Sequence, residues 1–418
     1  MTRALLHIDQ AYSLRDADRR GQLQFITSRN RNGFFSKVIS VHPLMGVLGN
    51  HWATKFDCQQ LTSDHQVIDG FLAGRRIPFL LVVLNVIQTQ IRIILWMRDT
   101  VRRHDIDLIY AADCFYTGFL GAVVKKLTGR PLMIGIMANH DLAYETTGVI
   151  AYPRLLRFRR VEQWLQRRVL AAADWIEIAA EDSAQYVQRY GAEPAKFVRL
   201  PVVKFIEPRH LVPPSDRGPP GPALSQLGIP ADKPMLICLG RLRPVKYSLD
   251  AFDAMRIALE KAPEAIAIFA GDGELRGEIE TRIKAYGLTG RIFLPGNIDQ
   301  AALSAILPGC IALSPLTGMA LIETSLAGAP PIVYDVEWQP EFVTNGTNGF
   351  VVPFRDSGAM GRAALRLIQE PDLRERLSAA ARDRALRFAD PQAYAHAEQT
   401  AFQRILGPEK RGRELCPS

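Results

Sequence analysis

Short, wholly apolar segments alternate with longer amphipathic segments along almost the whole chain, and this alternation constrains the fold more than any other feature. A wholly apolar segment predicts a strand buried on both faces, because a half-exposed strand alternates apolar and polar residues. Parallel strands need helical crossovers, which cover both faces of a sheet. The sequence therefore predicts an α/β fold with strands at Ala4–Ile8, Lys37–Val41, Leu108–Ala111, Leu132–Met137, Trp175–Ala179, Met235–Leu239, Ala265–Ala270, Ile292–Leu294, Ile311–Leu313, Pro331–Tyr334 and Gly349–Val352.

A segment rich in proline and glycine divides this alternation into two halves. It reads EPRHLVPPSDRGPPGPALSQLGIP, a composition typical of a linker. A chain of 418 residues is long enough for two domains. We therefore predict an N-terminal domain at residues 1–206, a linker at 207–232 and a C-terminal domain at 233–388. Both domains are expected to be doubly wound and Rossmann-like, and to face each other across a cleft.

The net charge indicates the kind of partner to expect, and the cysteine content excludes two kinds of protein. A formal net charge of +8 favours an anionic partner such as nucleic acid, a phosphate-bearing substrate or an anionic membrane surface. The 5 cysteines are scattered without a C-x-x-C pair, which argues against a disulfide framework and a zinc site. The N-terminus lacks the apolar core of a signal peptide, and the most apolar run, Ile77–Ile87, is too short to span a bilayer. We therefore expect a soluble or peripheral cytoplasmic protein.

The loop after the predicted strand Met235–Leu239 has the residues of a phosphate site. Gly240 allows a tight exit from the strand, and Arg241 and Lys246 place two cations before the next helix. Ligands of doubly wound domains bind beyond the carboxyl ends of the strands, and cations beside a helix N-terminus suit a diphosphate. A solvated turn would explain the same residues, because Arg243 lies in this loop as well.

The next two predicted strands also end in glycine turns. Gly271, Asp272 and Gly273 follow one of them and are explained by a plain joint between strand and helix. Gly296 and Asn297 follow the other, and the backbone there could hold a flat base. Asn297 is therefore a candidate for binding a nucleotide.

The stretch SPLTGMALIETSLAGAP predicts a helix that begins beside the same edge of the sheet. Thr317 and Gly318 read as a turn and cap before that helix. The free amides of Gly318, Met319 and Ala320 would then suit a diphosphate, because the positive helix end lies behind them. Glu323 lies one turn further along, where a carboxylate could either hold a ribose or interact with the helix dipole.

Four motifs taken together resemble a known family. GRLRPVK, AGDGELR, LIETSLAGAPPIVYD and TNGTNGFVVP occur in this order within residues 233–356. They are similar to the C-terminal domain of group 1 retaining glycosyltransferases, which have the GT-B fold. The resemblance implies that Arg241 and Lys246 contact the diphosphate of a nucleotide-sugar donor and that Glu323 holds its ribose. Pro315 stands eight positions before Glu323, where the family usually has a glutamate that touches the donor sugar.

The N-terminal half resembles the same family more loosely. In the segment IGIMANHDLAY, His140 follows a predicted strand, and in the family a histidine here contacts the donor sugar and its phosphate. We expect Asn139 and Asp141 to be its neighbours. Glu181 and Asp182 are expected to cap the next helix or to face the acceptor. The glycine-rich loop that usually follows the family's first strand is absent, and the unranked candidates in its place are Asp9, Arg19, Arg20 and Arg29.

Two basic amphipathic stretches could contact an anionic bilayer. The first stretch carries an apolar stripe that consists of Leu80, Leu84, Ile87, Ile91 and Ile94. This stripe is more simply explained as facing the core of the protein. The second, PRLLRFRRVEQWLQRR, suits a solvated helix and a membrane surface equally. In the family the last helix crosses back to the N-terminal domain, which implies this role for residues 389–407. Residues 408–418 are expected to form a disordered tail.

The resemblance implies a retaining glycosyltransferase that moves a sugar from a nucleotide diphosphate sugar to a glycan or lipid-linked acceptor. It implies no metal ion and no cofactor, and no Asp-x-Asp motif is seen at a strand end. The alternative is a nucleotide-sugar 2-epimerase or hydrolase on the same fold, because TGMALIE is similar to the corresponding turn of those enzymes. Nucleic acid is not an expected partner, since only Phe158 and Trp164 interleave aromatic rings with cations. Peripheral association with the inner face of the membrane would suit a lipid-linked acceptor.

Overall fold

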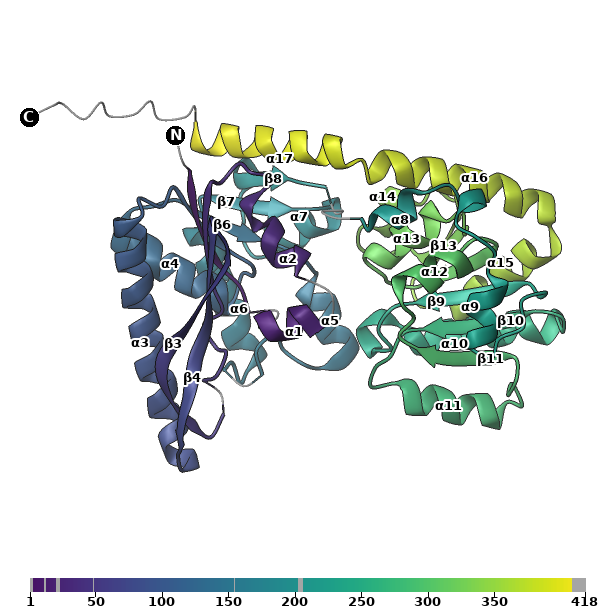
Figure 1. The fold of residues 1–418 in the computed structure, drawn as a ribbon, viewed down its shortest axis with the longest axis horizontal. Coiled ribbons are helices and arrows are strands. Elements are labelled where there is room, and N and C mark those ends of the chain that lie inside the picture. Colours follow the sequence, from purple (N-terminus) through teal and green to yellow (C-terminus); the bar gives the residue numbers. More distant parts are fainter. Residues whose placement is uncertain are drawn as a thin grey trace, which may run out of the picture. The chain divides into compact units, whose positions relative to one another are not determined.

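The computed structural model describes residues 3–10, 13–19, 23–47, 49–153, 155–201 and 206–407 (Figure 1). The chain forms two compact α/β units. The first comprises Met1–Asp141, Val149–Val202 and Gln392–Ser418, and the second comprises Leu142–Gly148 and Val203–Pro391. The predicted tail at 408–418 lies outside the described residues, as does Arg20.

An eight-stranded sheet organises the first unit, in the order β3-β4-β2-β1-β5-β6-β7-β8. All neighbouring strands are parallel except β3 and β4, which form an antiparallel pair at one edge. The strands are β1 Ala4–Ile8, β2 Lys37–Val41, β3 His51–Thr62, β4 His65–Arg76, β5 Leu108–Ala111, β6 Leu132–Gly135, β7 Trp175–Ile178 and β8 Phe197–Arg199. The helices are α1 Leu14–Arg19, α2 Gln24–Thr27, α3 Phe79–Arg103, α4 Tyr116–Thr128, α6 Arg159–Ala172, α7 Glu181–Gln188 and α17 Pro391–Leu406. Helix α5 His140–Thr147 begins in this unit at His140 and Asp141, and its remaining residues belong to the second unit.

Alternate residues of these strands point to opposite faces of the sheet, so the unit has two cores. On one face, Leu6 and Ile109 pack with side chains from α3, α4 and α6. On the other face, Leu5 and Tyr110 pack with Phe402 of α17. The three helices α3, α4 and α6 therefore form one layer, and the last helix of the chain covers the opposite side.

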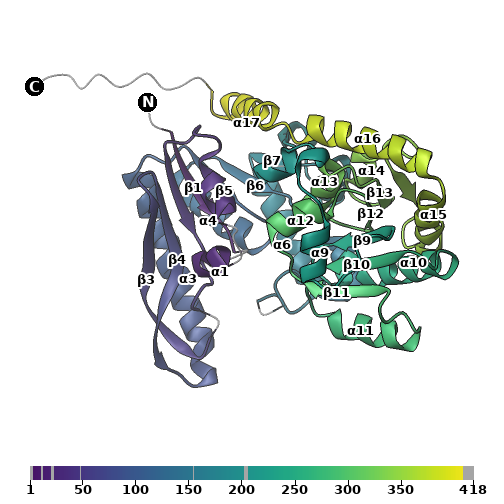
Figure 2. The ribbon, with the colours of Figure 1, turned by 45° about the vertical axis from the view of Figure 1, so that its right-hand side comes forward.

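The pair β3 and β4 is the main element absent from the sequence prediction. Figure 2 shows the two long strands running beside α3. β3 is largely exposed and carries charged and polar residues at many positions, so it has no wholly apolar run. Edge strands that face water lack the signal by which the central strands are found.

The last helix is tied to the first unit by buried ionic groups. Glu398 of α17 accepts hydrogen bonds from Arg31 at 2.9 Å, from Asn32 at 2.9 Å and from the Tyr394 hydroxyl at 2.9 Å. Arg31 also pairs with Glu177 of β7 at 3.3 Å. Both carboxylates and the guanidinium are almost completely excluded from solvent. The chain's last helix therefore completes the interior of its first unit.

A six-stranded parallel sheet organises the second unit, in the order β11-β10-β9-β12-β13-β14. Its strands are β9 Met235–Leu239, β10 Ile266–Ala270, β11 Ile292–Gly296, β12 Cys310–Ser314, β13 Pro331–Tyr334 and β14 Phe350–Val352. Its helices are α8 Pro208–Leu211, α9 Gly221–Gln226, α10 Ser248–Lys261, α11 Arg276–Ala285, α12 Gln300–Ile306, α13 Met319–Leu326, α14 Gln339–Phe342, α15 Ser357–Gln369 and α16 Pro371–Phe388. Buried side chains cover both faces of the sheet, as the wholly apolar strands predict. Every strand predicted from the sequence is present, with ends that differ by at most two residues.

The linker predicted at residues 207–232 is instead a folded part of the second unit. It forms the short helices α8 and α9, and it buries Leu224 and His210. The Arg217 guanidinium donates to the Leu326 carbonyl of α13 at 2.9 Å, which fixes the segment to the unit's interior. Its proline and glycine residues form tight turns between these helices, so the composition signalled turns rather than an unstructured connection.

Candidate active site

The predicted phosphate-binding residues of the second unit lie at the centre of its sheet. β9 and β12 are neighbours, while the strand after β9 in sequence, β10, lies on the far side of β9. The chain therefore switches direction across the sheet at this point, which is where ligands of doubly wound sheets bind. Arg241 and Lys246 follow β9, and Thr317 follows β12. The structure brings these predicted residues to adjacent strand ends.

Glycines allow the loops after β9 and β10 to pack backbone against backbone. Gly240 has φ of +141° and donates its amide to the Ala270 carbonyl at 3.0 Å. A Cβ atom on Gly271 would lie 2.0 Å from the Gly240 carbonyl oxygen, and one on Gly273 would lie 2.3 Å from that of Leu242. These positions exclude any side chain, so the loop that carries Arg241 has a fixed path.

Lys246 is a half-buried cation beside two further positive charges. Burial lowers the pKa of Lys246, Glu337 opposes this effect, and the charges of Arg241 and Arg243 lower the pKa further. A half-buried ammonium group of this kind gains stability when an anion binds beside it. Arg243 differs from its neighbours, because its exposed side chain pairs with Glu274 at 3.3 Å. The solvated-turn interpretation therefore fits Arg243 better than Lys246.

A buried glutamine shapes the loop between β12 and α13. The Gln339 side chain donates to the Pro315 carbonyl at 2.7 Å and accepts from the Thr317 amide at 3.1 Å. Sequence reasoning missed Gln339, since a lone glutamine on a short helix carries no local signal. Pro315 occupies the position where the related family usually has a glutamate, and here its carbonyl is bound by Gln339 instead.

The turn and cap predicted at Thr317 and Gly318 are present before helix α13. The N-cap is Gly318, without a side-chain hydrogen bond, and α13 begins at Met319. The Thr317 hydroxyl is buried and has no hydrogen-bond partner among the described residues. Together with the first amides of α13, at Met319 and Ala320, this hydroxyl offers unsatisfied donors to an anion.

Glu323 lies beyond the first turn of α13, where interaction with the helix dipole is weak. Burial, with a smaller contribution from the charge of Glu207, raises the pKa of Glu323 to about 7. Glu323 is half-buried, and no salt bridge to it is found among the described residues, so ionising this carboxyl is costly unless hydroxyl groups donate to it. A ribose that donates two hydroxyl groups would meet this requirement, which favours the ribose interpretation over the helix-dipole interpretation.

We expect Glu323→Gln to stabilise the ligand-free protein at about pH 8 but not at about pH 4. The pKa of this carboxyl rises from its ordinary value of 4.5 in the unfolded chain to about 7 in the folded protein, so the penalty for folding grows between these two pH values. Removing the carboxyl should raise the free energy of unfolding by about 1–3 kcal/mol above pH 7. Thermal melts at both pH values measure the difference, with exposed Glu264→Gln as the control. Equal melting temperatures of Glu323→Gln and wild type at about pH 8 would contradict the raised pKa.

Asn297 follows β11 at the opposite side of β10 from β9. It is exposed, and Gly296 before it has φ of +82°. The Gly296 carbonyl accepts from the Gly271 amide at 2.8 Å, which joins this turn to the loop after β10. The predicted base-binding residue therefore lies on the same edge of the sheet as the phosphate loop, but two strands away from it.

His140 begins α5 in the first unit. Its ring contacts Phe115 edge-on at 4.8 Å between centroids. Burial lowers the pKa of His140 to about 4, although Glu162 opposes the shift, so the imidazole is neutral at physiological pH. A neutral ring can exchange hydrogen bonds with hydroxyl groups but supplies no positive charge.

The neighbours of His140 are held by further polar contacts. The Asn139 side chain donates to Asp182 at 3.2 Å, and its oxygen accepts from the Asp141 amide at 3.2 Å. Asp141 accepts from the Tyr190 hydroxyl at 2.6 Å. The prediction that Glu181 and Asp182 cap α7 is wrong, because its N-cap is Ala180 without a side-chain hydrogen bond. Asp182 instead fixes the loop that carries His140.

A polar cluster lies at the carboxyl ends of β1 and β2 in the first unit. Asp9 pairs with Arg29 at 2.5 Å, and Arg29 contacts His42 at 3.2 Å. His42 pairs with Asp69 at 2.6 Å. Asp9 and Arg29 were candidates from the sequence, whereas His42 and Asp69 were missed. His42 directly follows a predicted strand, so its position could have identified it, but Asp69 lies in the unpredicted β4.

A second group of polar residues lies after β5. Asp113 accepts hydrogen bonds from the Tyr152 hydroxyl at 2.6 Å and from the Phe115 amide at 2.7 Å. Burial raises the pKa of Asp113, these hydrogen bonds oppose the shift, and the charge of Asp9 raises the pKa further. The electrostatic effect of Asp9 on Asp113 indicates that Asp113 lies near the cluster around Asp9. Sequence reasoning missed Asp113 as well, although it follows a predicted strand.

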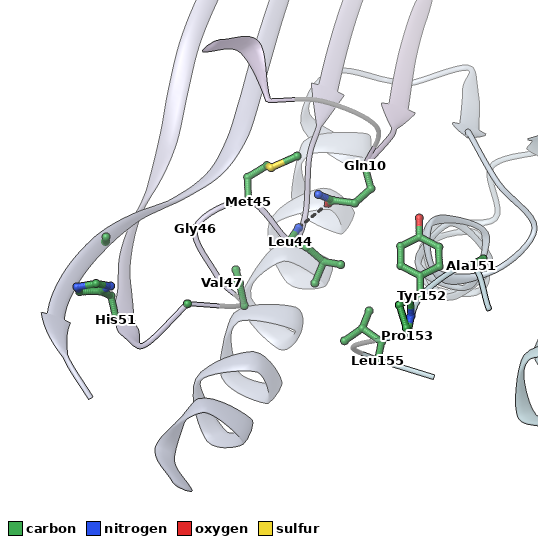
Figure 3. Close-up of a pocket in the computed structure, with 12 residues that line it drawn as sticks. Gln10, Leu44, Met45, Gly46, Val47, His51, Ala151, Tyr152, Pro153 and Leu155 are labelled. Atoms are coloured by element: carbon green, nitrogen blue, oxygen red, sulfur yellow. Dashed lines mark hydrogen bonds between the residues drawn. The ribbon is translucent and has the colours of Figure 1, made fainter. Parts of the chain in front are cut away.

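A cavity of about 580 Å³ opens beside these polar groups (Figure 3). Gln10 is a polar group on its wall, and its side-chain oxygen accepts from the Leu44 amide at 2.7 Å. The ring of Tyr152 faces the same space from the opposite side. Most of the residues that line the cavity are apolar. The full lining consists of Gln10, Leu44, Met45, Gly46, Val47, Gly49, His51, Ala73, Ala151, Tyr152, Pro153 and Leu155.

Comparison with known protein families gives two matches. Residues 223–384 match the family described as glycosyl transferases group 1. Residues 66–202 match a glycosyl transferase 4-like domain. The first match contains the loops after β9 and β12 and helix α13, and the second contains His140 and Asp113.

Curated and solved relatives are distant in sequence. Alpha-D-kanosaminyltransferase of Streptomyces kanamyceticus is 23% identical over 303 residues, which cover 68% of this chain and 75% of that protein. Two further curated bacterial relatives match over only 44% and 25% of their own length. Sucrose-phosphate synthase of Thermosynechococcus elongatus has a TM-score of 0.71 at 16% identity, covering 96% of this chain and 99% of that one. Anabaena HepE in complex with UDP-glucose has a TM-score of 0.68 at 15% identity, with 96% and 99% covered.

Proposed function

Because the chain belongs to the group 1 glycosyltransferases and has the GT-B fold, we propose that it transfers a sugar from a nucleotide diphosphate sugar to a hydroxyl acceptor with retention of configuration. The acceptor is a glycan or a lipid-linked molecule, and the reaction belongs to the synthesis of a glycan, lipopolysaccharide or glycolipid. We place it in the cytoplasm, where such donors are made.

The observation that carries this proposal is the convergence of positive charge at the direction switch between β9 and β12. Lys246 and Arg241 come from one strand end, and the hydroxyl and amides of Thr317, Met319 and Ala320 come from the next. A departing nucleoside diphosphate gains negative charge in the transition state, so fixed donors at this point lower the barrier. We infer that these groups supply the charge that a metal ion supplies in other transferases, and no cofactor is needed.

The proposed reaction breaks the bond between the sugar C1 and the phosphate oxygen. A bond forms between C1 and the acceptor oxygen on the same face, and the acceptor proton passes to the departing phosphate oxygen. Glu323 would hold the ribose, and Asn297 with Gly296 would contact the base. The neutral imidazole of His140 suits a hydrogen bond to a sugar hydroxyl, which is why we assign it to the donor sugar. His140 would then take the place of the family's glutamate contact to the donor sugar, which Pro315 cannot make because its carbonyl is bound by Gln339.

The cavity of the first unit is the best candidate for the acceptor. Its lining is mainly apolar, with Gln10 and the Tyr152–Asp113 pair beside it. Apolar walls with few polar groups favour a ligand that has an apolar part as well as a hydroxyl group. This supports an acceptor that carries a lipid or another apolar group.

A thermal-shift screen tests the donor part of the proposal. Nucleoside diphosphates, such as UDP and GDP, are expected to raise the melting temperature by several degrees, since a ligand at about 100 times its Kd adds about 2.7 kcal/mol. The matching nucleotide sugars then serve as donors in assays with membrane extracts, and NMR of the product reports the anomeric configuration. Inversion at C1 would contradict retention. Epimer formation from the donor alone would support the epimerase alternative instead.

A further inference from the structure

Helix α3 presents apolar side chains to solvent and polar side chains to the interior. Leu84, Ile87 and Ile91 are 55%, 51% and 54% exposed, whereas Asn85 and Thr89 are completely buried. The prediction that this stripe faces the core is therefore wrong for these three residues. By length and composition the helix contains a stretch, Leu81–Arg103, that could cross a membrane, and this stretch extends beyond the short apolar run Ile77–Ile87.

The polar face of α3 is buried because it binds the backbone of the edge strands. The Asn85 side chain accepts from the Ala53 amide at 3.0 Å and donates to the His51 carbonyl at 3.1 Å. The Gln90 side-chain oxygen accepts from the Tyr116 hydroxyl. Further along the same face, Ile93 and Met97 join the core. The apolar stripe is thus turned outward by specific contacts, and α3 cannot rotate to bury it.

Helix α6 has the same reversed arrangement. Trp164 and Val161 are 56% and 44% exposed, whereas Glu162 and Gln166 are completely buried. Glu162 accepts from the Ala151 amide, and Gln166 donates to the Tyr186 hydroxyl at 2.7 Å. The stretch that the sequence left open between a solvated helix and a membrane surface therefore exposes aromatic and apolar groups.

Both helices belong to the layer of α3, α4 and α6 that covers one face of the first sheet. α4 packs against both neighbours and adds Phe119, which is exposed. We call the outward side of these three helices the outer helix face. The outer helix face therefore carries exposed apolar residues on three adjacent helices, a feature that marks interaction surfaces when such residues are contiguous.

The outer helix face is strongly cationic. Glu162 and Asp99 are the two acidic residues of the three helices, and Glu162 is buried. Exposed basic residues lie at the ends of the helices and along α6, and they are Arg75, Arg76, Arg102, Arg103, Lys126, Arg157, Arg160, Arg167 and Arg168. In α6, the Arg168 guanidinium lies over the Trp164 ring at 5.8 Å. Apolar and aromatic groups bordered by arginines are typical of helices that lie in the headgroup region of anionic bilayers.

We propose that the outer helix face docks on an anionic phospholipid bilayer, with α3 lying in the membrane surface. A bilayer is favoured over a protein partner because exposed arginines or lysines accompany the exposed apolar residues on all three helices, with almost no acidic residue, as a negatively charged plane requires. The same helix does not span the bilayer, because its polar face binds β3 and the cavity wall. The docking gives the enzyme access to acceptors with a lipid part, and this purpose rests on the proposed function.

Co-sedimentation of the full chain with vesicles tests the docking. Vesicles of phosphatidylcholine with about a quarter phosphatidylglycerol are compared with phosphatidylcholine alone. We expect binding to the anionic vesicles that weakens as salt rises. Ile91→Glu should lower the partition coefficient by about tenfold or more, because it puts a charge in the apolar stripe. Arg102→Gln should lower it about fivefold, from about 1 kcal/mol per cation near the surface.

Leu386→Glu is the matched control, since Leu386 is an exposed leucine on helix α16 of the second unit. It should bind vesicles as wild type does, and circular dichroism should show that all variants are folded. Absence of binding to anionic vesicles, or equal binding by Ile91→Glu and Leu386→Glu, would overturn the proposal. Self-association through the outer helix face without vesicle binding would overturn it as well. Nucleotide-induced thermal shifts measured on the same samples report separately on the proposed donor site.

Discussion

Lys246→Ala is expected to lower the rate of sugar transfer by about 10²–10³-fold while leaving the fold intact. The Lys246 side chain is half-buried beside Arg241 and Arg243, and its lowered pKa reflects desolvation and this positive charge, so a bound anion would stabilise its charged form. The transferred sugar leaves behind a diphosphate that gains charge in the transition state, and a lost cation therefore reduces kcat more than donor binding. Single-turnover rates with a nucleotide-sugar donor, once identified, measure the effect.

Arg243→Ala provides the control for this experiment. Arg243 lies in the same loop, but its side chain is exposed and pairs with Glu274. We expect it to retain most of the activity, whereas Arg241→Ala should behave like Lys246→Ala. Full activity of Lys246→Ala would show that the loop after β9 does not stabilise the leaving group. Thermal melts of all three variants exclude unfolding as the cause.

Glu398→Ala is expected to destabilise the first unit by about 3–5 kcal/mol. The carboxylate is buried and accepts hydrogen bonds from Arg31, Asn32 and the Tyr394 hydroxyl, so its loss leaves a buried guanidinium with only Glu177 to balance it. Urea titrations followed by tryptophan fluorescence and circular dichroism would measure the change, which should appear in the transition of the first unit.

Thr400→Ala is the control on the same helix, because Thr400 is exposed. It should change the free energy of unfolding by less than about 0.5 kcal/mol. A similarly small change for Glu398→Ala would mean that α17 contributes little to the first unit's interior. Glu398→Gln adds a further test, since it keeps the shape of the side chain and removes the charge that balances Arg31.

The sequence predicted the second unit better than the first. Its strands are wholly apolar and its binding loops follow strand ends directly, so local patterns contain most of the information. Arg241, Lys246, Thr317 and Glu323 lie where those patterns place them. Gln339 could not be predicted, because its role depends on a hydrogen bond to Pro315 that the local sequence does not encode.

The first unit departs from the prediction where polar residues have interior roles. Asn85 and Glu162 are buried because they bind backbone groups that are distant in sequence or belong to irregular loops. Apolar periodicity therefore gave the correct helix but the wrong face for α3. The long edge strand β3 was missed for a related reason, since its exposed side chains remove the apolar signal.

The position of α17 determines the order in which the protein can fold during synthesis. Most of the first unit precedes the second unit along the chain, yet its interior includes Phe402 and Glu398, which follow the second unit. A ribosome must therefore make the whole second unit before the first can be completed. Until then, Phe35 and Leu5 lack their last neighbour, and Arg31 has only one of its two carboxylates. The nascent chain must therefore carry a partly open N-terminal half for most of its translation, a period in which such chains are prone to aggregate.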